Sequence, residues 1–275
     1  MSVVVEYDRN GFRKLRYKSS TLFKKVNYLT SKPMVSNVIT EYDLRAANIS
    51  ALRQAKAMKK ADLDALLELP SYDRKVIIGN MIRVDPRIRF IIADQILKAR
   101  KRLFMANHIQ DDEVLSIKND AVFVVGRKLK ELTFGHMVFR PKHSYSFYLN
   151  LDDLELYYDR SRNTVDIKGI KDEVVEEEDH QQGIVSFLAR CCSLLMNDRR
   201  DELRDYLIRF TEDYKARKLP YRFYRELSKV NAYRIGNAQS GYSINLVQVS
   251  QKDVDDLNII YNYQRFVMPM IHRFL

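Results

Sequence analysis

Cysteine, glycine and proline are scarce in this sequence, and each shortage excludes a class of protein. The 275 residues include 2 Cys, 8 Gly and 6 Pro. The cysteines, Cys191 and Cys192, are neighbours, which rarely form a disulfide with good geometry, and two thiols cannot complete a zinc site. We expect both to be reduced core residues of a cytosolic protein. So little glycine and proline argues against a disordered or linker-rich chain.

Long hydrophobic runs and several enzyme signatures are also missing. No apolar run of about 18 residues occurs, so no membrane span is expected. The N-terminus lacks a basic stretch followed by a long apolar one, so we expect no signal peptide. The phosphate-binding loop, the Gly-x-Ser-x-Gly elbow and the His-Glu-x-x-His zinc motif are absent. With 46% hydrophobic residues, the chain can still build a sizeable core.

Positive charge is in excess, since 47 Lys and Arg face 36 Asp and Glu, a net charge of +11. This balance suggests a polyanionic partner, of which nucleic acid is the commonest. Residues 9–32 are rich in Lys and Arg, have no acidic residue and contain interleaved aromatics, which suits phosphate contacts and base stacking. The alternative is a solvated basic surface. A second basic and aromatic cluster, over 215–229, indicates either a duplex-gripping surface or an ordinary amphipathic helix.

Strand-like and helix-like stretches alternate along the chain. We expect a strand over 38–43, followed by helices over 46–58, 59–69, 72–83 and 87–107. In the last of these, Lys98, Arg100, Lys101 and Arg102 lie largely off the apolar face. A β region should follow, with a hairpin at 114–125 and strands near 136–140, 144–150, 154–158 and 164–168. The C-terminal part predicts helices over 181–197, 199–216, 222–230 and 253–274, and a strand over 242–249. This order predicts an α+β fold with a mostly antiparallel sheet.

Two aspartates on short apolar strands carry most of the functional information. Asp43 ends a strand-like run that turns helical, whereas Asp120 lies between two strands of the expected hairpin. Two carboxylates from separate strands can bind a pair of hard cations, which is the core of two-metal phosphoryl transfer. The alternative for each is a turn former or a helix cap.

Three segments, in order along the chain, share the pattern of a known family. Asp43-Leu-Arg-Ala-Ala-Asn48 is similar to the motif Asp-x-x-Ser-Leu-Tyr-Pro-Ser, and Lys118-Asn119-Asp120-Ala-Val is similar to Asp-Thr-Asp-Ser-Val. Residues 157–172 are similar to a strand pair that carries a Lys-Gly element, here Lys168-Gly169. Together these segments resemble the palm and thumb of a right-hand nucleic-acid polymerase, closest to family B DNA polymerases of the protein-primed phage kind.

The resemblance implies a mechanism and a set of cofactors. Asp43 and Asp120 would hold two Mg²⁺ ions, with Mn²⁺ as an alternative. One ion would activate a primer 3′-hydroxyl, and the other would bind the triphosphate of the incoming nucleotide. The expected partners are therefore primer-template DNA or RNA, nucleoside triphosphates and phage replication proteins. The expected location is the cytoplasm, of a host cell if the protein is phage-encoded.

The resemblance also implies further binding residues. Asn48 replaces the tyrosine that screens the sugar 2′-position, so it would lie under the nucleotide sugar. The fingers motif has no clean counterpart, and the nearest residues for binding the triphosphate are Arg74, Lys75 and Asn80. The alternative for Arg74 and Lys75 is an ordinary charged helix face. Lys118 replaces the first acid of the second motif. The expected nucleic-acid contacts are Lys118, Lys168, Gly169, Arg222 and Lys229, and the basic composition of residues 9–32 adds Lys14 and Arg16.

The implied layout is a minimal polymerase core. It comprises a basic N-terminal segment (1–37), a first palm part (38–58), a helical fingers-like insertion (59–107), a second palm part (108–175) and a thumb-like helical region (176–275). A proofreading exonuclease domain would not fit in the residues before Asp43. The expected function is template-directed nucleotidyl transfer, of the DNA polymerase or primase type. The alternatives are a catalytically degenerate polymerase-fold protein that binds nucleic acid, and a metal-dependent nuclease.

Overall fold

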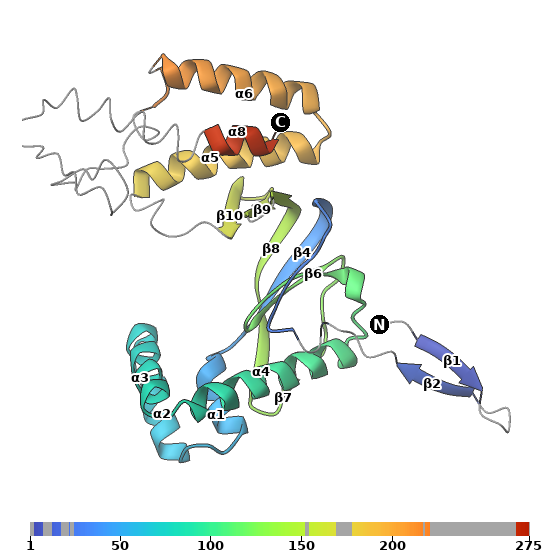
Figure 1. Ribbon diagram of the computed structural model, residues 1–275, viewed down its shortest axis with the longest axis vertical. Coiled ribbons are helices and arrows are strands. Elements are labelled where there is room, and N and C mark those ends of the chain that lie inside the picture. Colours follow the sequence, from blue (N-terminus) through green and yellow to red (C-terminus); the bar gives the residue numbers. More distant parts are fainter. Residues whose placement is uncertain are drawn as a thin grey trace, which may run out of the picture. The chain divides into compact units, whose positions relative to one another are not determined.

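The computed structural model describes residues 3–7, 13–17, 22, 25–151, 154–168, 178–216, 218–220 and 268–274. The fold is mixed α+β with a curled antiparallel sheet (Figure 1). The chain divides into two compact units. Unit 1 comprises Met1–Lys32 and Asn37–Tyr145, and unit 2 comprises Pro33–Ser36 and Ser146–Leu275. No helix in the described ranges is long and apolar enough to cross a membrane.

Unit 1 is built on an antiparallel sheet with the strand order β8–β4–β6–β5–β3. The strands are β3 (Asn27–Leu29), β4 (Met34–Leu44), β5 (Val114–Lys118), β6 (Ala121–Val125) and β8 (Met137–Leu151), and the short β7 (Thr133–Phe134) pairs with the start of β8. A separate hairpin joins β1 (Val3–Tyr7) to β2 (Arg13–Tyr17). Strands β4 and β8 each contribute residues to both units.

Four helices accompany the unit 1 sheet. They are α1 (Ala47–Gln54), α2 (Lys60–Glu68), α3 (Ser71–Val84) and α4 (Arg87–Ala106). The chain leaves β4 directly into α1, and α1 then packs against α2 and α4 (Figure 1). Side chains alternate across a strand. Accordingly, Tyr42 and Leu44 of β4 and Val122 and Val124 of β6 belong to the core that these helices share.

Unit 2 has a smaller sheet and its own core. The end of β8 pairs with β9 (Leu154–Asp159), which pairs with β10 (Thr164–Lys168). Helix α5 (Glu178–Met196) packs on this sheet and on α6 (Arg200–Lys215), and α8 (Met268–Phe274) adds side chains to the same core. Cys191 and Cys192 are buried free thiols whose pKa is raised by burial. The expectation that they are core residues is confirmed.

One carboxylate organises the turn between β9 and β10. Asp159 accepts hydrogen bonds from the backbone N–H and the hydroxyl group of Ser161, and from the backbone and guanidinium of Arg162. Burial opposes ionisation of this carboxyl group, but the hydrogen bonds outweigh it and lower the pKa of Asp159 to about 2. The ionised carboxylate therefore serves to hold the turn.

Several boundaries differ from the sequence expectations. The expected strands 136–140 and 144–150 form the single strand β8, which continues through the exposed Pro141. Strand β4 begins at Met34 rather than at residue 38. The sequence pattern did not predict its first residues as strand, because they are mostly exposed and lack the alternation of a half-buried strand. The expected segment 108–175 is divided between the two units at 145/146. The expected elements 222–230 and 242–249, and most of 253–274, lie outside the described residues.

Arg100 is the clearest departure from the sequence pattern. The helical periodicity places it largely off the apolar face of its helix, but only 1% of it is exposed. Its guanidinium donates to the carbonyl oxygens of Lys25, Val26 (3.3 Å) and Asn119 (3.1 Å). These bonds join α4 to the segment before β3 and to the turn between β5 and β6. Burial lowers the pKa of Arg100 to about 10.

We expect Arg100→Met to destabilise the protein by about 3 kcal/mol, because three backbone carbonyl groups would lose a buried charged donor. The measurement is urea unfolding followed by circular dichroism. Arg102→Met, an exposed position on the same helix, is the matched control and should change stability by less than about 0.5 kcal/mol. Equal effects of the two substitutions would contradict the anchoring role of Arg100.

Candidate active site

Asp43 lies where β4 turns into α1. The strand ends at Leu44, and the backbone N–H of Arg45 donates to the carbonyl oxygen of Val138 on β8 (2.9 Å). Ala46 then adopts the left-handed conformation, with φ 46°, before α1 begins. This conformation is costly for a residue with a Cβ atom. The abrupt turn leaves Asp43 at the end of a paired strand, where its side chain is 19% exposed.

Asp120 lies in the two-residue turn between β5 and β6. Asn119, the first residue of the turn, has φ 52°, a conformation that asparagine tolerates better than most residues. Its backbone N–H donates to the side chain of Asn27 (3.0 Å), while Arg100 holds its carbonyl oxygen. The turn is therefore fixed from two sides through its backbone.

The pairing of β4 with β6 brings the two aspartates together. Asp43 is opposite Ala121, the residue that directly follows Asp120. Glu41, two residues before Asp43, lies on the same face of β4. This face is opposite to the one from which Tyr42 enters the core shared with the helices.

The pKa of Asp120 is affected by the nearby carboxylate of Asp43. Burial of its carboxyl group and the negative charge of Asp43 raise the pKa of Asp120. A backbone hydrogen bond and the positive charges of Lys142 and Lys75 act in the opposite direction without cancelling the increase. Two carboxylates that repel each other in a partly buried site are an arrangement that a bound cation would stabilise.

Lys142 on β8 places a cation beside this acidic group. Its Nζ atom is 3.3 Å from Oε1 of Glu41 and 4.0 Å from Oδ2 of Asp43. Tyr145 also donates to Glu41, through its hydroxyl group (3.2 Å). Glu41 therefore contacts both Lys142 and Tyr145, whereas Asp43 has a longer and weaker contact with the amine of Lys142.

The donor atoms fit a hard divalent cation. Asp43 and Asp120 offer carboxylate oxygens, the ligands that Mg²⁺ prefers. Their mutual repulsion would be relieved by a shared positive charge. Lys142 opposes such binding, because its amine already partly neutralises Asp43.

The expected nucleotide-binding residues have different surroundings. Lys75 is exposed on α3, and its charge acts on Asp120. Arg74 instead donates to the carbonyl oxygen of Leu67 at the end of α2 (3.1 Å), a contact between helices. Asn80 is exposed on α3, and Asn48 is half-buried in the first turn of α1. Of these four residues, Lys75 is the one whose charge acts on an aspartate of the site.

The expected nucleic-acid contacts are dispersed over the chain. Lys118 is the half-buried last residue of β5 and is paired with Ala121, next to Asp120. Lys168 ends β10 in unit 2. Lys14 and Arg16 lie on β2, opposite Glu6 and Val4. Gly169, Arg222 and Lys229 lie outside the described residues.

The sequence patterns did not point to Glu41 or Lys142. Glu41 had a usable signal, because it precedes Asp43 by two residues on the same strand and so shares its face. No local sequence pattern could indicate Lys142, because its position depends on the pairing of β8 with β4, which are about a hundred residues apart in the chain.

The comparison with known families places the chain in one of them. The family model described as the bacteriophage PBS1 gene 130 protein matches residues 15–275. The chain belongs to this family. Among the curated proteins, nothing matches it. The description names a phage gene.

We expect Asp120→Asn to raise the free energy of unfolding at pH 7. The raised pKa means that the folded protein binds more protons than the unfolded chain between the unfolded pKa, about 3.9, and the folded one. The stability of the wild type should therefore fall, relative to the variant, as pH rises through this window. Urea unfolding at a series of pH values measures the difference.

Asp94→Asn, on an exposed position of α4, is the control and should not show this rise. A loss of stability in Asp120→Asn at every pH would instead make Asp120 a structural turn residue.

Proposed function

We propose that this protein is a template-directed nucleotidyltransferase, of the DNA polymerase or primase type, with a polymerase-like palm in unit 1. The observation that carries the proposal is the electrostatic coupling of Asp43, near the end of β4, and Asp120, which directly precedes the paired strand β6. The resemblance of both segments to family B polymerase motifs supports the same assignment. The substrates would be a primer-template and nucleoside triphosphates.

The roles of the residues follow from their charges. Asp43 and Asp120 would hold Mg²⁺, which supplies charge neutralisation and activation of the attacking hydroxyl group when bound. Lys75 carries a positive charge that acts on Asp120 and suits the binding of a triphosphate. Arg100 acts as a positioning residue, because it fixes the backbone next to Asp120.

We expect Mg²⁺-dependent extension of a labelled primer by the wild type, and at least a hundredfold loss in Asp43→Asn and in Asp120→Asn. Removing one carboxylate from a two-acid site weakens the binding of Mg²⁺, whose positive charge the transition state requires. Asp94→Asn should extend at the wild-type rate. Extension that survives both substitutions would refute the assignment, and shortening of the primer would indicate a nuclease.

A catalytically degenerate polymerase-fold protein that binds nucleic acid is the second candidate. It is favoured by Lys142, whose amine contacts Glu41 and approaches Asp43 where a catalytic site would need a free carboxylate. Lys118, which replaces an acid of the resembling motif, supports the same alternative. In such a protein, lysine would have taken over the neutralisation that a metal ion provides in an enzyme.

Lys142→Met separates these two functions. If the aspartates bind Mg²⁺, removing the competing amine should tighten Mg²⁺ binding about fivefold, about 1 kcal/mol. The rise in melting temperature with Mg²⁺ then occurs at lower concentration. Lys128→Met, an exposed position in the same unit, should leave it unchanged. Absence of any Mg²⁺-dependent shift in the wild type and in Lys142→Met would favour the degenerate protein.

A further inference from the structure

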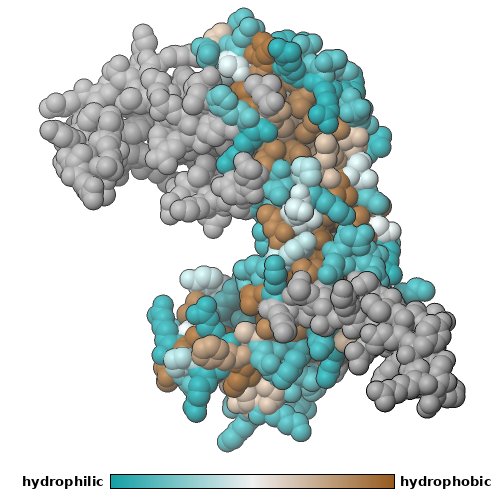
Figure 2. Space-filling model, turned by 45° about the vertical axis from the view of Figure 1, so that its right-hand side comes forward, coloured by the Kyte–Doolittle hydropathy of each residue, from teal (hydrophilic) through white to brown (hydrophobic). Residues whose placement is uncertain are grey.

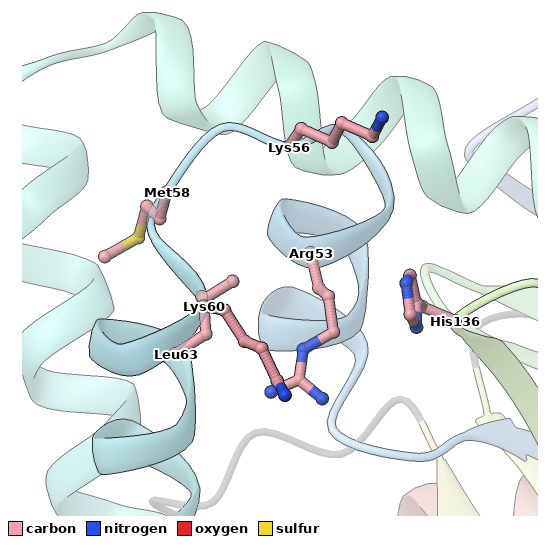
Figure 3. Close-up of a pocket in the computed structure, with 6 residues that line it drawn as sticks. All are labelled: Arg53, Lys56, Met58, Lys60, Leu63 and His136. Carbon is pink, nitrogen blue, oxygen red and sulfur yellow. The ribbon is translucent and has the colours of Figure 1, made fainter.

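A cavity of about 330 Å³ opens in unit 1, formed by the end of α1, the start of α2 and the turn between β7 and β8. Its six lining residues are Arg53, Lys56, Met58, Lys60, Leu63 and His136 (Figure 3). The candidate active site does not include any of these residues. A volume of this size is at the small end of the range for ligand pockets.

The lining is strongly cationic. Arg53, Lys56 and Lys60 carry three positive charges, and none of the six lining residues is acidic. Figure 3 shows the Lys60 side chain extending toward the Arg53 guanidinium. Asp64 pairs with Arg53, and among the described residues no carboxylate pairs with Lys56 or Lys60. The Nε atom of Arg53 is buried and has no hydrogen-bond partner in the described part of the chain.

Helix stability explains only part of this charge. Arg53 lies in the last turn of α1, where a cation interacts favourably with the helix dipole. Lys60 is the first residue of α2, where a cation is unfavourable and an anion is favoured. The N-cap residue Lys59 makes no side-chain capping bond. Asp62, in the first turn of α2, already offsets part of the helix dipole, and a bound anion would also offset the repulsion between the cations.

The backbone around the cavity is held in place. Lys56 has φ 53°, and the hydrogen bond from the backbone N–H of Ala57 to the carbonyl oxygen of Leu52 closes the end of α1 (3.0 Å). The side chain of Gln54 accepts a hydrogen bond from the backbone N–H of His136 (2.8 Å), which attaches the β7–β8 turn to α1. Gly135 has φ 67°, and a Cβ atom there would lie 2.5 Å from the Gln54 side chain, so this close turn favours glycine.

The other exposed surfaces of the described residues specify a ligand less clearly. Hydrophobic side chains are exposed on α3 and at the start of α4, at Tyr72, Val76, Val84 and Phe90. Figure 2 shows hydrophobic atoms among hydrophilic ones in the lower part of the view, which belongs to unit 1. Nothing in the structure indicates what covers them. The cavity combines a small hollow with three cationic side chains, which together favour an anion.

We propose that this cavity binds a phosphate group. Three cations around a small hollow suit a compact anion with several oxygen acceptors. The apolar side chains of Met58 and Leu63 provide contact for the part of the ligand that carries the phosphate. The phosphate can belong to a nucleotide or to the backbone of a nucleic acid, and binding measurements distinguish these sources.

The test compares three probes on the full chain without divalent metal: inorganic tripolyphosphate, ATP and a short single-stranded oligonucleotide. We expect at least one probe to bind, and the double substitution Lys56→Gln/Lys60→Gln to weaken its binding at least tenfold, as measured by calorimetry. Binding of ATP but not of the oligonucleotide would identify a nucleotide site. For an oligonucleotide, the dependence of log K on log salt should also become shallower by about 0.7 for each phosphate that the removed lysines neutralise.

Lys59→Gln is the matched control, since it removes one exposed charge next to Lys60 but outside the lining. It should retain wild-type affinity. Asp120→Asn should also retain it, so that failure of the proposed catalysis is distinguishable from failure of this site. Circular dichroism verifies that each variant is folded. Equal losses in Lys59→Gln and the double variant, or binding of no probe by the wild type, would overturn the proposal.

Discussion

The buried guanidinium of Arg100 is the interaction on which the geometry of the candidate active site depends. It joins α4 to the segment before β3 and to the turn that carries Asp120, through three backbone carbonyl groups. Burying a cation is costly, and the lowered pKa of Arg100 records that cost. Because the bonds go to backbone atoms, they hold the turn without engaging the carboxylate of Asp120.

The acidic site is held together against its own repulsion. Asp43 and Asp120 lie close enough for one to raise the pKa of the other, and partial burial strengthens the effect. Lys142 and Lys75 offset part of this cost from two different elements, β8 and α3. A bound cation would relieve the repulsion between two partly buried carboxylates and so stabilise the folded protein. Two turn-forming aspartates on an open surface would gain less, because water screens their repulsion.

Local patterns predicted part of this architecture. The strand-like run before Asp43, the hairpin around Asp120 and the periodic helix over 87–107 each depend on near neighbours in the sequence. The burial of Arg100 could not be predicted in this way, because an arginine is buried only where distant carbonyl groups converge on it. Lys142 reaches Glu41 for a similar reason, through strand pairing across about a hundred residues. The positions of Arg100 and Lys142 therefore depend on nonlocal hydrogen bonds and on the pairing of distant strands.

The helix α1 separates two opposite electrostatic environments within unit 1. Asp43 precedes its first residue, whereas Arg53 lies in its last turn, and eight residues of helix span about 12 Å. Bare carboxylates repel a phosphate, so the acidic end can approach one only when a cation lies between them. The cationic end has no such requirement. The proposed phosphate binding and the proposed phosphoryl chemistry therefore depend on different residues, and loss of the aspartates would not by itself remove the cationic site.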